Sequence, residues 1–283
     1  ATATAGYGDF VYLTLQARND YTSTLEEDNR SIIYPSASIS FLPFEAIPSL
    51  RDNGVIDYAK VRLSYGTSAG YPNPYRTRSI LNAGTRVFQD ADGTILNANN
   101  VSNVLGNPTL TPELHSELEF GLEALFFGGR LGLDLSLYDK TSSDLIIDLP
   151  LDPATGYTIT TVNGAEINNK GIELGLNFSP VKTASFQWDA TLNFTRNIPT
   201  VESIISGVDQ VNIAGFDNLG NFAIPGEPYG VMIGTDFNRD EAGNLTVDGQ
   251  GTYTENANPV VIGNPNPDIQ ANWANSFSNK GYS

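Results

Sequence analysis

The sequence predicts an all-β protein, because apolar and polar residues alternate with a period of two along most of the chain. In the clearest segment, Leu118, Phe120 and Leu122 are separated by Glu119 and Gly121. The spacing of three to four residues that marks amphipathic helices is nearly absent. We therefore expect strands that each have one apolar face and one polar face.

Eight strands follow from this alternation. Three weaker segments come first, followed by a pair separated by Gly128 and Gly129, a second pair separated by a turn that contains Pro180, and one last strand. Segments 228–238 and 244–249 alternate only in part and are two further candidates. The eight strands are expected near residues 7–18, 31–42, 57–67, 114–127, 130–147, 162–179, 185–196 and 268–279.

Three features favour an antiparallel transmembrane β-barrel over a soluble sandwich, although each of them also occurs in soluble proteins. The apolar faces run unbroken over about five positions, which suits the roughly 9–11 residues of a tilted membrane-crossing strand. Short turns at 127–130 and 179–184 alternate with long connections at 68–112, 148–161 and 198–228. Aromatic residues gather at strand ends, as in the girdles of membrane barrels. These residues are Phe41, Phe44, Phe126, Phe127, Phe186, Trp188, Phe277 and Tyr282.

Charge and composition exclude several functions. The 283 residues include 15 Lys and Arg against 32 Asp and Glu, a formal net charge of −17, which argues against a nucleic-acid surface. The absence of cysteine and the presence of one histidine, His115, remove thiol catalysis, cysteine-based zinc sites and most catalytic triads. Strand periodicity explains the acidic residues without glycosidase chemistry. We expect neither an enzyme nor a cofactor.

The polar faces are too charged for the dry interior of a small eight-stranded barrel. A wide, wet lumen with more strands than this chain supplies is expected instead. The polar side chains of such a wall would offer hydrogen bonds to a hydrated cargo, and the wall itself would present little apolar area. The residues predicted to face this lumen are Glu117, Glu119, Glu123 and Glu173, together with Asp134, Asp189, Lys60 and Arg62.

The longest loop contains four candidate ligand-binding residues. Tyr71, Tyr75, Arg76 and Arg78 combine aromatic rings with planar hydrogen-bond donors, as contacts to sugars or peptides often do. A solvated loop without a ligand is the preferred explanation of this set.

A second loop segment has a weak resemblance to a metal site. Asp236, Asn238 and Asp240 have the oxygen-ligand spacing of a calcium loop, but Glu241 occupies the position where the sharp turn requires glycine. With Gly243 following, we expect a hairpin turn here and no metal. His115 is likewise expected to be a lumen or turn residue and not a metal ligand.

The motifs of the chain, taken together, resemble those of one family. Residues 107–123, NPTLTPELHSELEFGLE, resemble the "NP.L.PE…E.G.E" stretch of SusC/RagA-type TonB-dependent outer-membrane transporters. Further segments match the same barrel in the same order along the chain. They are YPSAS at 34–38, RLSYG at 62–66, FFGGRL at 126–131, YDKT at 138–141, DLI at 144–146, NNKGIEL at 168–174 and IGNPNPD at 262–268.

This resemblance implies a 22-stranded barrel in the bacterial outer membrane, with short periplasmic turns, long extracellular loops and an N-terminal plug domain. It also implies import of oligosaccharides or peptides, driven by the TonB complex and assisted by a SusD-like surface lipoprotein. Residues 1–283 are expected to form the C-terminal part of this barrel, without the plug domain and the last strands. Isolated, such an open sheet is expected to aggregate.

Two other functions remain open from the sequence. One is a passive, porin-like or small structural barrel, which would conduct ions without a partner or an energy source. The other is a soluble β-rich surface adhesin or binding module, which would remain folded without detergent.

Overall fold

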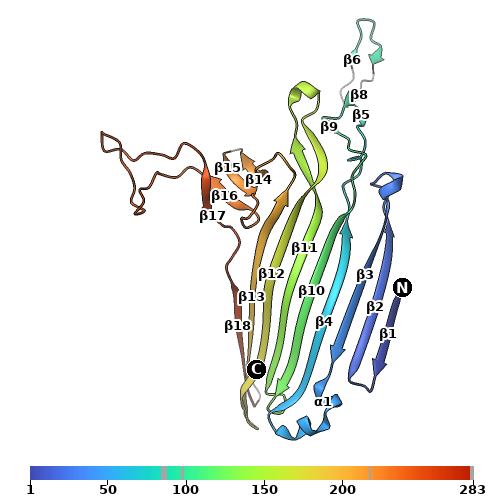
Figure 1. The fold of residues 1–283 in the computed structure, drawn as a ribbon, viewed down its shortest axis with the longest axis vertical. Coiled ribbons are helices and arrows are strands. Elements are labelled where there is room, and N and C mark those ends of the chain that lie inside the picture. The colour runs from blue at the N-terminus through green and yellow to red at the C-terminus, as the bar shows by residue number, and fades with distance from the viewer. Residues whose placement is uncertain (84–87, 97–98, 217, 281–283) are drawn as a thin grey trace.

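A computed structural model describes residues 1–83, 88–96, 99–216 and 218–280 (Figure 1). Its main element is a sheet whose long strands lie side by side in chain order and pair antiparallel, while the short β9 (Val104–Leu105) pairs parallel with β12. The long strands are β1 (Thr2–Tyr7), β2 (Val11–Tyr21), β3 (Ser31–Phe41), β4 (Ile56–Gly70), β10 (Glu113–Phe126), β11 (Leu131–Pro150), β12 (Ile159–Lys182), β13 (Phe186–Ile204) and β18 (Gln270–Asn279). This arrangement confirms the predicted all-β, antiparallel class.

The register between the strands aligns apolar residues with apolar residues in rows across the sheet. Leu122 of β10 pairs with Leu135 of β11, which pairs with Leu174 of β12, which pairs with Phe194 of β13. Because side chains alternate between the two faces of a strand, every such row leaves its polar neighbours on the opposite face. The sheet therefore has one continuous apolar face and one polar face.

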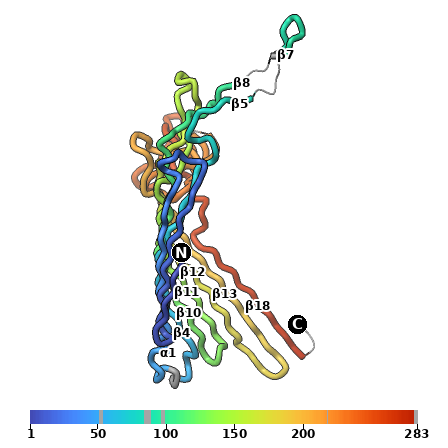
Figure 2. Tube along the Cα trace, turned by 90° about the vertical axis from the view of Figure 1, so that its right-hand side faces the viewer, coloured from blue at the N-terminus to red at the C-terminus, as the bar shows by residue number. Residues whose placement is uncertain are grey.

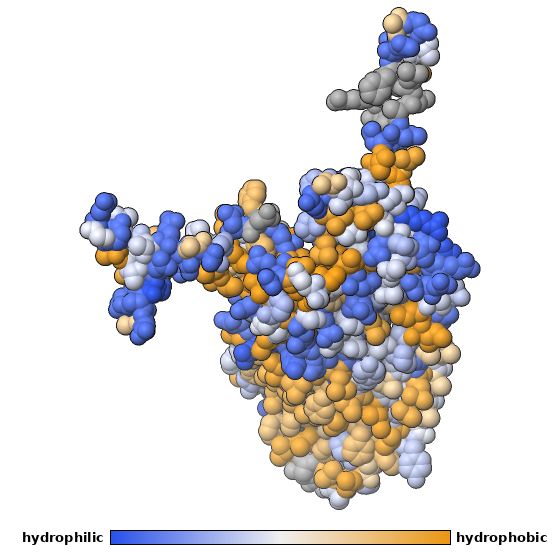
Figure 3. Space-filling view, turned by 45° about the horizontal axis from the view of Figure 1, so that its top comes forward, coloured by the Kyte–Doolittle hydropathy of each residue, from blue (hydrophilic) through white to orange (hydrophobic). Residues whose placement is uncertain are grey.

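The apolar face has a defined upper border. Figure 3 shows hydrophobic side chains over the lower part of the strands and hydrophilic side chains toward the loops. On β11 and β12, the border is marked by Asp139 and Lys170, paired across the strands with 3.5 Å between charged atoms. The apolar face of β10 from Leu118 to Phe126 covers nine residues, which is within the roughly 9–11 residues that a tilted membrane-crossing strand needs.

The connections at the lower end are mostly tight turns. Residues 127–130 join β10 to β11, and Phe127, Gly128 and Gly129 all have positive φ, the left-handed conformation that a tight turn requires. The connection 42–55 at the same end is longer and contains the short helix α1 (Pro43–Ala46) and the 3₁₀ helix η2 (Pro48–Asn53). The β3–β4 connection is therefore an exception among the short turns at this end.

The aromatic residues form a belt at the lower end of the sheet. Trp188 stacks on Phe277 with ring centroids 5.8 Å apart, and Phe10 meets Phe41 edge to face at 6.3 Å. Phe44 is an exception, because it is buried within α1. Tyr282, also predicted for this belt, lies outside the described residues.

The first predicted strand, 7–18, is wrong at its start. A hairpin occupies this region, with β1 ending at Tyr7 and β2 beginning at Val11. Gly8 and Asp9 form its turn, both with φ near +60°. The small Thr and Ala residues of β1 offer no apolar contrast, so the alternation gave no signal before the turn.

The long loops carry short strands that the alternation did not predict. β14 (Val211–Phe216), β15 (Leu219–Ala223), β16 (Val231–Gly234) and β17 (Val260–Gly263) form a four-stranded sheet at the loop end. Of the two doubtful candidates, 228–238 contains only β16, and 244–249 contains only isolated bridges. The loop 68–112 contains β9 and the two-stranded sheets β5–β8 (Leu81–Ala83, Asn99–Val101) and β6–β7 (Phe88–Gln89, Ile95–Leu96). Strands of two to six residues are too short for a period to stand out.

The main sheet is curved. Seen from the side, β13 and β18 lean away from β1–β4 (Figure 2). Within the described ranges, no helix has both the length and the apolar character needed to cross a bilayer. The edges of this curved sheet, among the described strands, are β1 and β18.

Candidate functional site

The polar face of the sheet brings together the charged side chains of its central strands. Lys60 of β4 pairs in register with Glu123 of β10, and the two lie 3.4 Å apart. Glu119 of β10 pairs with Tyr138 of β11, and Glu117 pairs with Lys140. Three of the four glutamates predicted to face the lumen are thus on the polar face of β10, and the fourth, Glu173, lies two strands away on β12.

Arg62 is the centre of a charged network on this face. Its guanidinium donates from Nη1 to Glu123 Oε1 at 2.6 Å, from Nε to Glu119 Oε1 at 3.2 Å and from Nη2 to Ser136 Oγ at 2.8 Å. Asp134 lies 3.5 Å from Nη2. One planar cation therefore forms ion pairs with three carboxylates, which is the geometry that arginine serves better than lysine.

A glycine makes room for this arginine. Arg62 lies on β4 and Ser136 on β11, so the guanidinium must cross the intervening strand β10. It crosses over Gly121, which pairs with both residues; a Cβ at this position would lie 2.2 Å from Arg62 Nε. Gly121 is therefore required by a close approach of side chain to backbone.

We expect Arg62→Ala to lower the free energy of unfolding of the full-length protein by about 1–3 kcal/mol, because hydrogen bonds to charged groups contribute about that much and the carboxylates would be left without their cation. The side chain is 28% exposed, so the effect is not screened fully by water. The free energy of unfolding of Arg62→Lys should lie between those of wild type and Arg62→Ala, because lysine keeps the positive charge but lacks the planar, forked set of donors.

Urea unfolding in detergent micelles, followed by tryptophan fluorescence, measures this change. Gln16→Ala, on the same face but outside the network, is the control and should leave the midpoint unchanged. Equal midpoints for wild type and Arg62→Ala would contradict the stabilising role of the network.

A second side chain crosses a strand in the same manner. Tyr138 of β11 lies over Gly171 of β12, and its hydroxyl donates to Asn197 Oδ1 of β13 at 3.3 Å. Asn197 pairs with Gly171, so the ring spans the full width of β12. The phenol is thereby held flat against the sheet.

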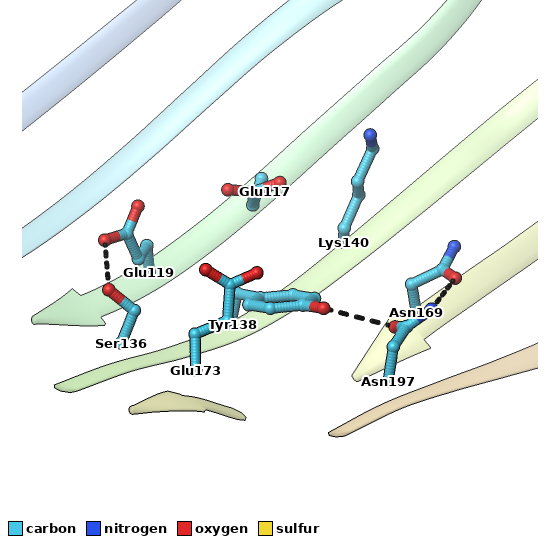
Figure 4. Close-up of a pocket in the computed structure, with 8 residues that line it drawn as sticks. All are labelled: Glu117, Glu119, Ser136, Tyr138, Lys140, Asn169, Glu173 and Asn197. Atoms are coloured by element: carbon cyan, nitrogen blue, oxygen red, sulfur yellow. Dashed lines mark hydrogen bonds between the residues drawn. The ribbon is translucent and has the colours of Figure 1, made fainter. Parts of the chain in front are cut away.

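An open depression of the polar face surrounds Tyr138 (Figure 4). Asn197 Nδ2 donates to Asn169 Oδ1 at 3.2 Å, which fixes both amides beside the tyrosine hydroxyl. The depression is lined by Glu117, Glu119, Ser136, Tyr138, Lys140, Asn169, Glu173 and Asn197. Its lining is rich in hydrogen-bonding groups and contains one aromatic ring.

The four loop candidates are separated by the structure. Arg76 forms an ion pair with Asp148 at 3.1 Å, and Arg78 forms a bidentate pair with Glu26, so both guanidinium groups are occupied by the protein itself. Tyr75 is exposed, with φ +65°. These residues do not converge on one site.

Tyr71 is the member of this set that the structure encloses. Its hydroxyl is buried without a hydrogen-bond partner among the described residues. Burial raises the pKa of this phenol, because the charged form is the one that loses hydration.

The pair between Glu26 and Arg78 joins two outer loops and is sensitive to acid. Hydrogen bonds from Arg78, and then from Thr77, lower the pKa of the Glu26 carboxyl to about 2. A depressed carboxyl pKa stabilises the folded loops above the ordinary value near 4.5, and this contribution is lost as the pH falls through about 2.

We expect spin labels at Asp28 and Ser79 to report a narrow distance distribution at pH 5 that broadens between pH 4 and pH 2. Glu26→Gln should give the broad distribution already at pH 5. Circular dichroism of the same samples separates loop release from unfolding of the sheet. A wild-type distribution that stays narrow at pH 2 would show that this pair does not hold the loops together.

The calcium-like segment forms a hairpin turn. Asp240 Oδ1 accepts from the backbone N–H of Ala242 and of Asn244, and Gly243 has φ +86°. The side-chain amide of Asn244 also donates to Asp240 Oδ2, and this bond, followed by the backbone bonds, holds the pKa of Asp240 below its usual value. Asn238 is engaged with Glu255 O. His115 Nδ1 is hydrogen bonded to Ser142, and the described residues contain no group of three or more acidic or histidine side chains placed to hold a metal ion.

These features together define a class of protein. An antiparallel sheet with an apolar band on one face, a charged network on the other, an aromatic belt at the turn end and long loops at the other end is the wall of an outer-membrane β-barrel. A family model described as "TonB dependent receptor-like, beta-barrel" matches residues 3–283. The chain belongs to this family of outer-membrane proteins.

Individual relatives agree with this assignment. TonB-dependent receptor P26 of Formosa agariphila is 29% identical over 97% of this chain and 29% of that protein's length. TonB-dependent receptor SusC of Bacteroides thetaiotaomicron is 25% identical over 69% of this chain and 20% of its length. The chain thus spans less than a third of these relatives, and its resemblance to the SusC/RagA type is confirmed.

The fold is also that of solved structures. The RagAB peptide importer in its closed-closed state superimposes with a TM-score of 0.81 at 20% identity, over 99% of this chain and 31% of that chain. The structure titled as the RagAB peptide transporter gives a TM-score of 0.80 over the same shares of the two chains. At this identity the comparison establishes the fold.

Proposed function

We propose that residues 1–283 form part of the wall of a TonB-dependent transporter that imports oligosaccharides or peptides across the outer membrane. The observation that carries this proposal is the family match over residues 3–283, on a sheet that is apolar on one face and charged on the other. The relatives are named receptors and importers, not enzymes.

The polar face is the proposed side of the passage. Glu117, Glu119, Glu123 and Glu173 lie on it, and Arg62 forms ion pairs with Glu119 and Glu123. Such a face needs water or polar matter beside it, whereas the apolar face needs lipid. The edge strands β1 and β18 carry backbone groups that only further strands could satisfy within a membrane. We infer that the chain contributes a sector of a larger closed barrel.

Two partners belong to the same proposal. Energy for import would come from the TonB complex, which acts through parts of the full-length protein outside this sector. A SusD-like surface lipoprotein would meet the long outer loops, because they project beyond the apolar band (Figures 1 and 3). The RagAB peptide importer, one chain of which shares this fold, is named as an importer.

The proposal is tested by growth. Deleting the full-length gene is expected to abolish growth on one oligomeric nutrient and to leave growth on its monomer intact, and deleting the TonB gene should give the same defect. Complementation with the wild-type gene is the control. Unchanged growth on every polymer and peptide tested would contradict import.

A passive barrel is distinguished by conductance. The purified full-length protein in a planar bilayer is expected to conduct little without its energy source. Steady, porin-like conductance in the absence of any partner would favour passive diffusion instead.

A further inference from the structure

The position of Tyr138 exposes one face of its ring to the polar side of the sheet. The ring is fixed from below by the backbone of Gly171 and at its tip by the hydrogen bond to Asn197 (Figure 4). A flat aromatic ring held in this way is a preformed stacking surface, which loses little conformational entropy when a ligand binds.

Hydrogen-bonding groups surround this ring at close range. The carboxylates of Glu117 and Glu173 and the ammonium group of Lys140 line the same depression, and within the described part of the chain none of the three has a side-chain hydrogen bond or ion pair. By contrast, Glu119 is engaged by Arg62 and Ser136. The depression therefore contains two free carboxylates, Glu117 and Glu173, and one engaged carboxylate, Glu119, which pairs in register with Tyr138.

The chemistry of the depression favours a neutral, hydroxyl-rich ring. The C–H face of a sugar stacks on an aromatic ring, while carboxylates and amides accept and donate hydrogen bonds at its hydroxyl groups. An extended apolar peptide would find one ring and little other apolar surface here.

The net negative charge of the polar face around Tyr138 disfavours anionic ligands. Five carboxylates face three cationic side chains across β4, β10, β11 and β12, so an anionic sugar would meet net repulsion. The residues are Glu117, Glu119, Glu123, Asp134 and Glu173 against Lys60, Arg62 and Lys140.

We propose that Tyr138, held over Gly171 and flanked by Glu117 and Glu173, is a sugar-binding subsite on the barrel wall that accepts neutral pyranose rings and rejects anionic ones. This inference rests on the proposed transport function and names the class of cargo that the passage recognises.

Isothermal titration of the full-length protein in detergent tests the subsite. The ligands are neutral hexasaccharides of glucose, xylose, mannose and galactose, with hexagalacturonate and hexaglycine for comparison. We expect at least one neutral hexasaccharide to bind at least about tenfold more tightly than the other two ligands. Tyr138→Ala should weaken that binding about tenfold, the usual order for losing one stacked ring, and Tyr138→Phe by less than about threefold.

Two further variants separate the platform from general effects. Gly171→Ala adds a Cβ 2.2 Å from Tyr138 Cζ, and because the ring end is the part that can move, it should be displaced while the sheet remains. This variant should also lose about tenfold in affinity. Tyr12→Ala is the matched control, since Tyr12 faces Gly6 in the same manner on the same face but far from the carboxylates. It should bind as wild type does.

The subsite is overturned if no neutral hexasaccharide binds, if hexagalacturonate or hexaglycine binds more tightly, or if Tyr138→Ala and wild type bind equally, as they would if another part of the full-length protein covered the ring. The growth test is independent of these results. If the gene is needed for growth but Tyr138→Ala binds as wild type does, the proposed function is retained and the subsite is rejected. If Tyr138→Ala weakens binding but deleting the gene changes no growth, the subsite is retained and the proposed import function is rejected.

Discussion

Leu174→Arg is expected to prevent stable assembly of the full-length barrel in the membrane. Leu174 lies between Leu135 and Phe194 in the middle row of the apolar face. An arginine at the lipid midplane costs about 2–4 kcal/mol in a membrane barrel, which is a large part of the stability of a typical domain. The side chain has no polar neighbour in that row with which to pair.

The measurement is the amount of heat-modifiable, folded protein in outer-membrane fractions, compared at equal expression. The matched control is Asn193→Arg, which places the same charge beside Phe194 but on the polar face. This control should assemble as wild type does. Normal assembly of Leu174→Arg would mean that the leucine face is not in lipid, and the membrane assignment of this face would fail.

Phe222→Ala should open the small sheet β14–β17 without disturbing the long strands. Phe222 is 2% exposed, and Val231 and Ile233 of β16 are also buried. Truncating a buried phenylalanine costs about 3–5 kcal/mol, and a sheet of four short strands has little stability to spare. The long strands do not depend on this ring, because their pairing is complete below the loop end.

Hydrogen exchange read by mass spectrometry distinguishes the two regions. Peptides covering 211–234 should exchange faster in Phe222→Ala, while peptides from β10–β12 keep their protection. Phe216→Ala, in the same sheet at a side chain that is 74% exposed, is the control and should change neither region. Loss of protection in both regions would show that the small sheet and the barrel wall unfold together.

The sequence predicted the strands of the wall because each is long enough for its alternation to be counted. The segments around Leu122, Leu135 and Leu174 were placed with their ends off by a few residues. β1 was missed, because Thr and Ala do not differ enough in hydropathy to mark a face. Of the small sheet, only β16 lies within a candidate segment, 228–238; the other three strands were missed, because they depend on pairing between distant short segments that local periodicity cannot report.

The charged residues of the polar face could be predicted, but their partners could not. The alternation of side chains along each strand assigns Glu119 and Arg62 to the polar face. Their hydrogen bond, however, depends on the register between β4 and β10. The role of Tyr138 was missed for the same reason. The available signal was the pair of glycines, Gly121 and Gly171, at polar-face positions of otherwise regular strands, where a missing side chain indicates that a neighbour lies across the backbone.

The order of the long strands has a consequence for how such walls change during evolution. Among the long strands, each pairs with the long strands before and after it in the chain, and tight turns close most of the hairpins at one end. Duplicating or deleting one hairpin would therefore leave all the other pairings in place and alter the circumference by two strands. The width of the barrel in this architecture can vary by whole hairpins, independently of the long loops.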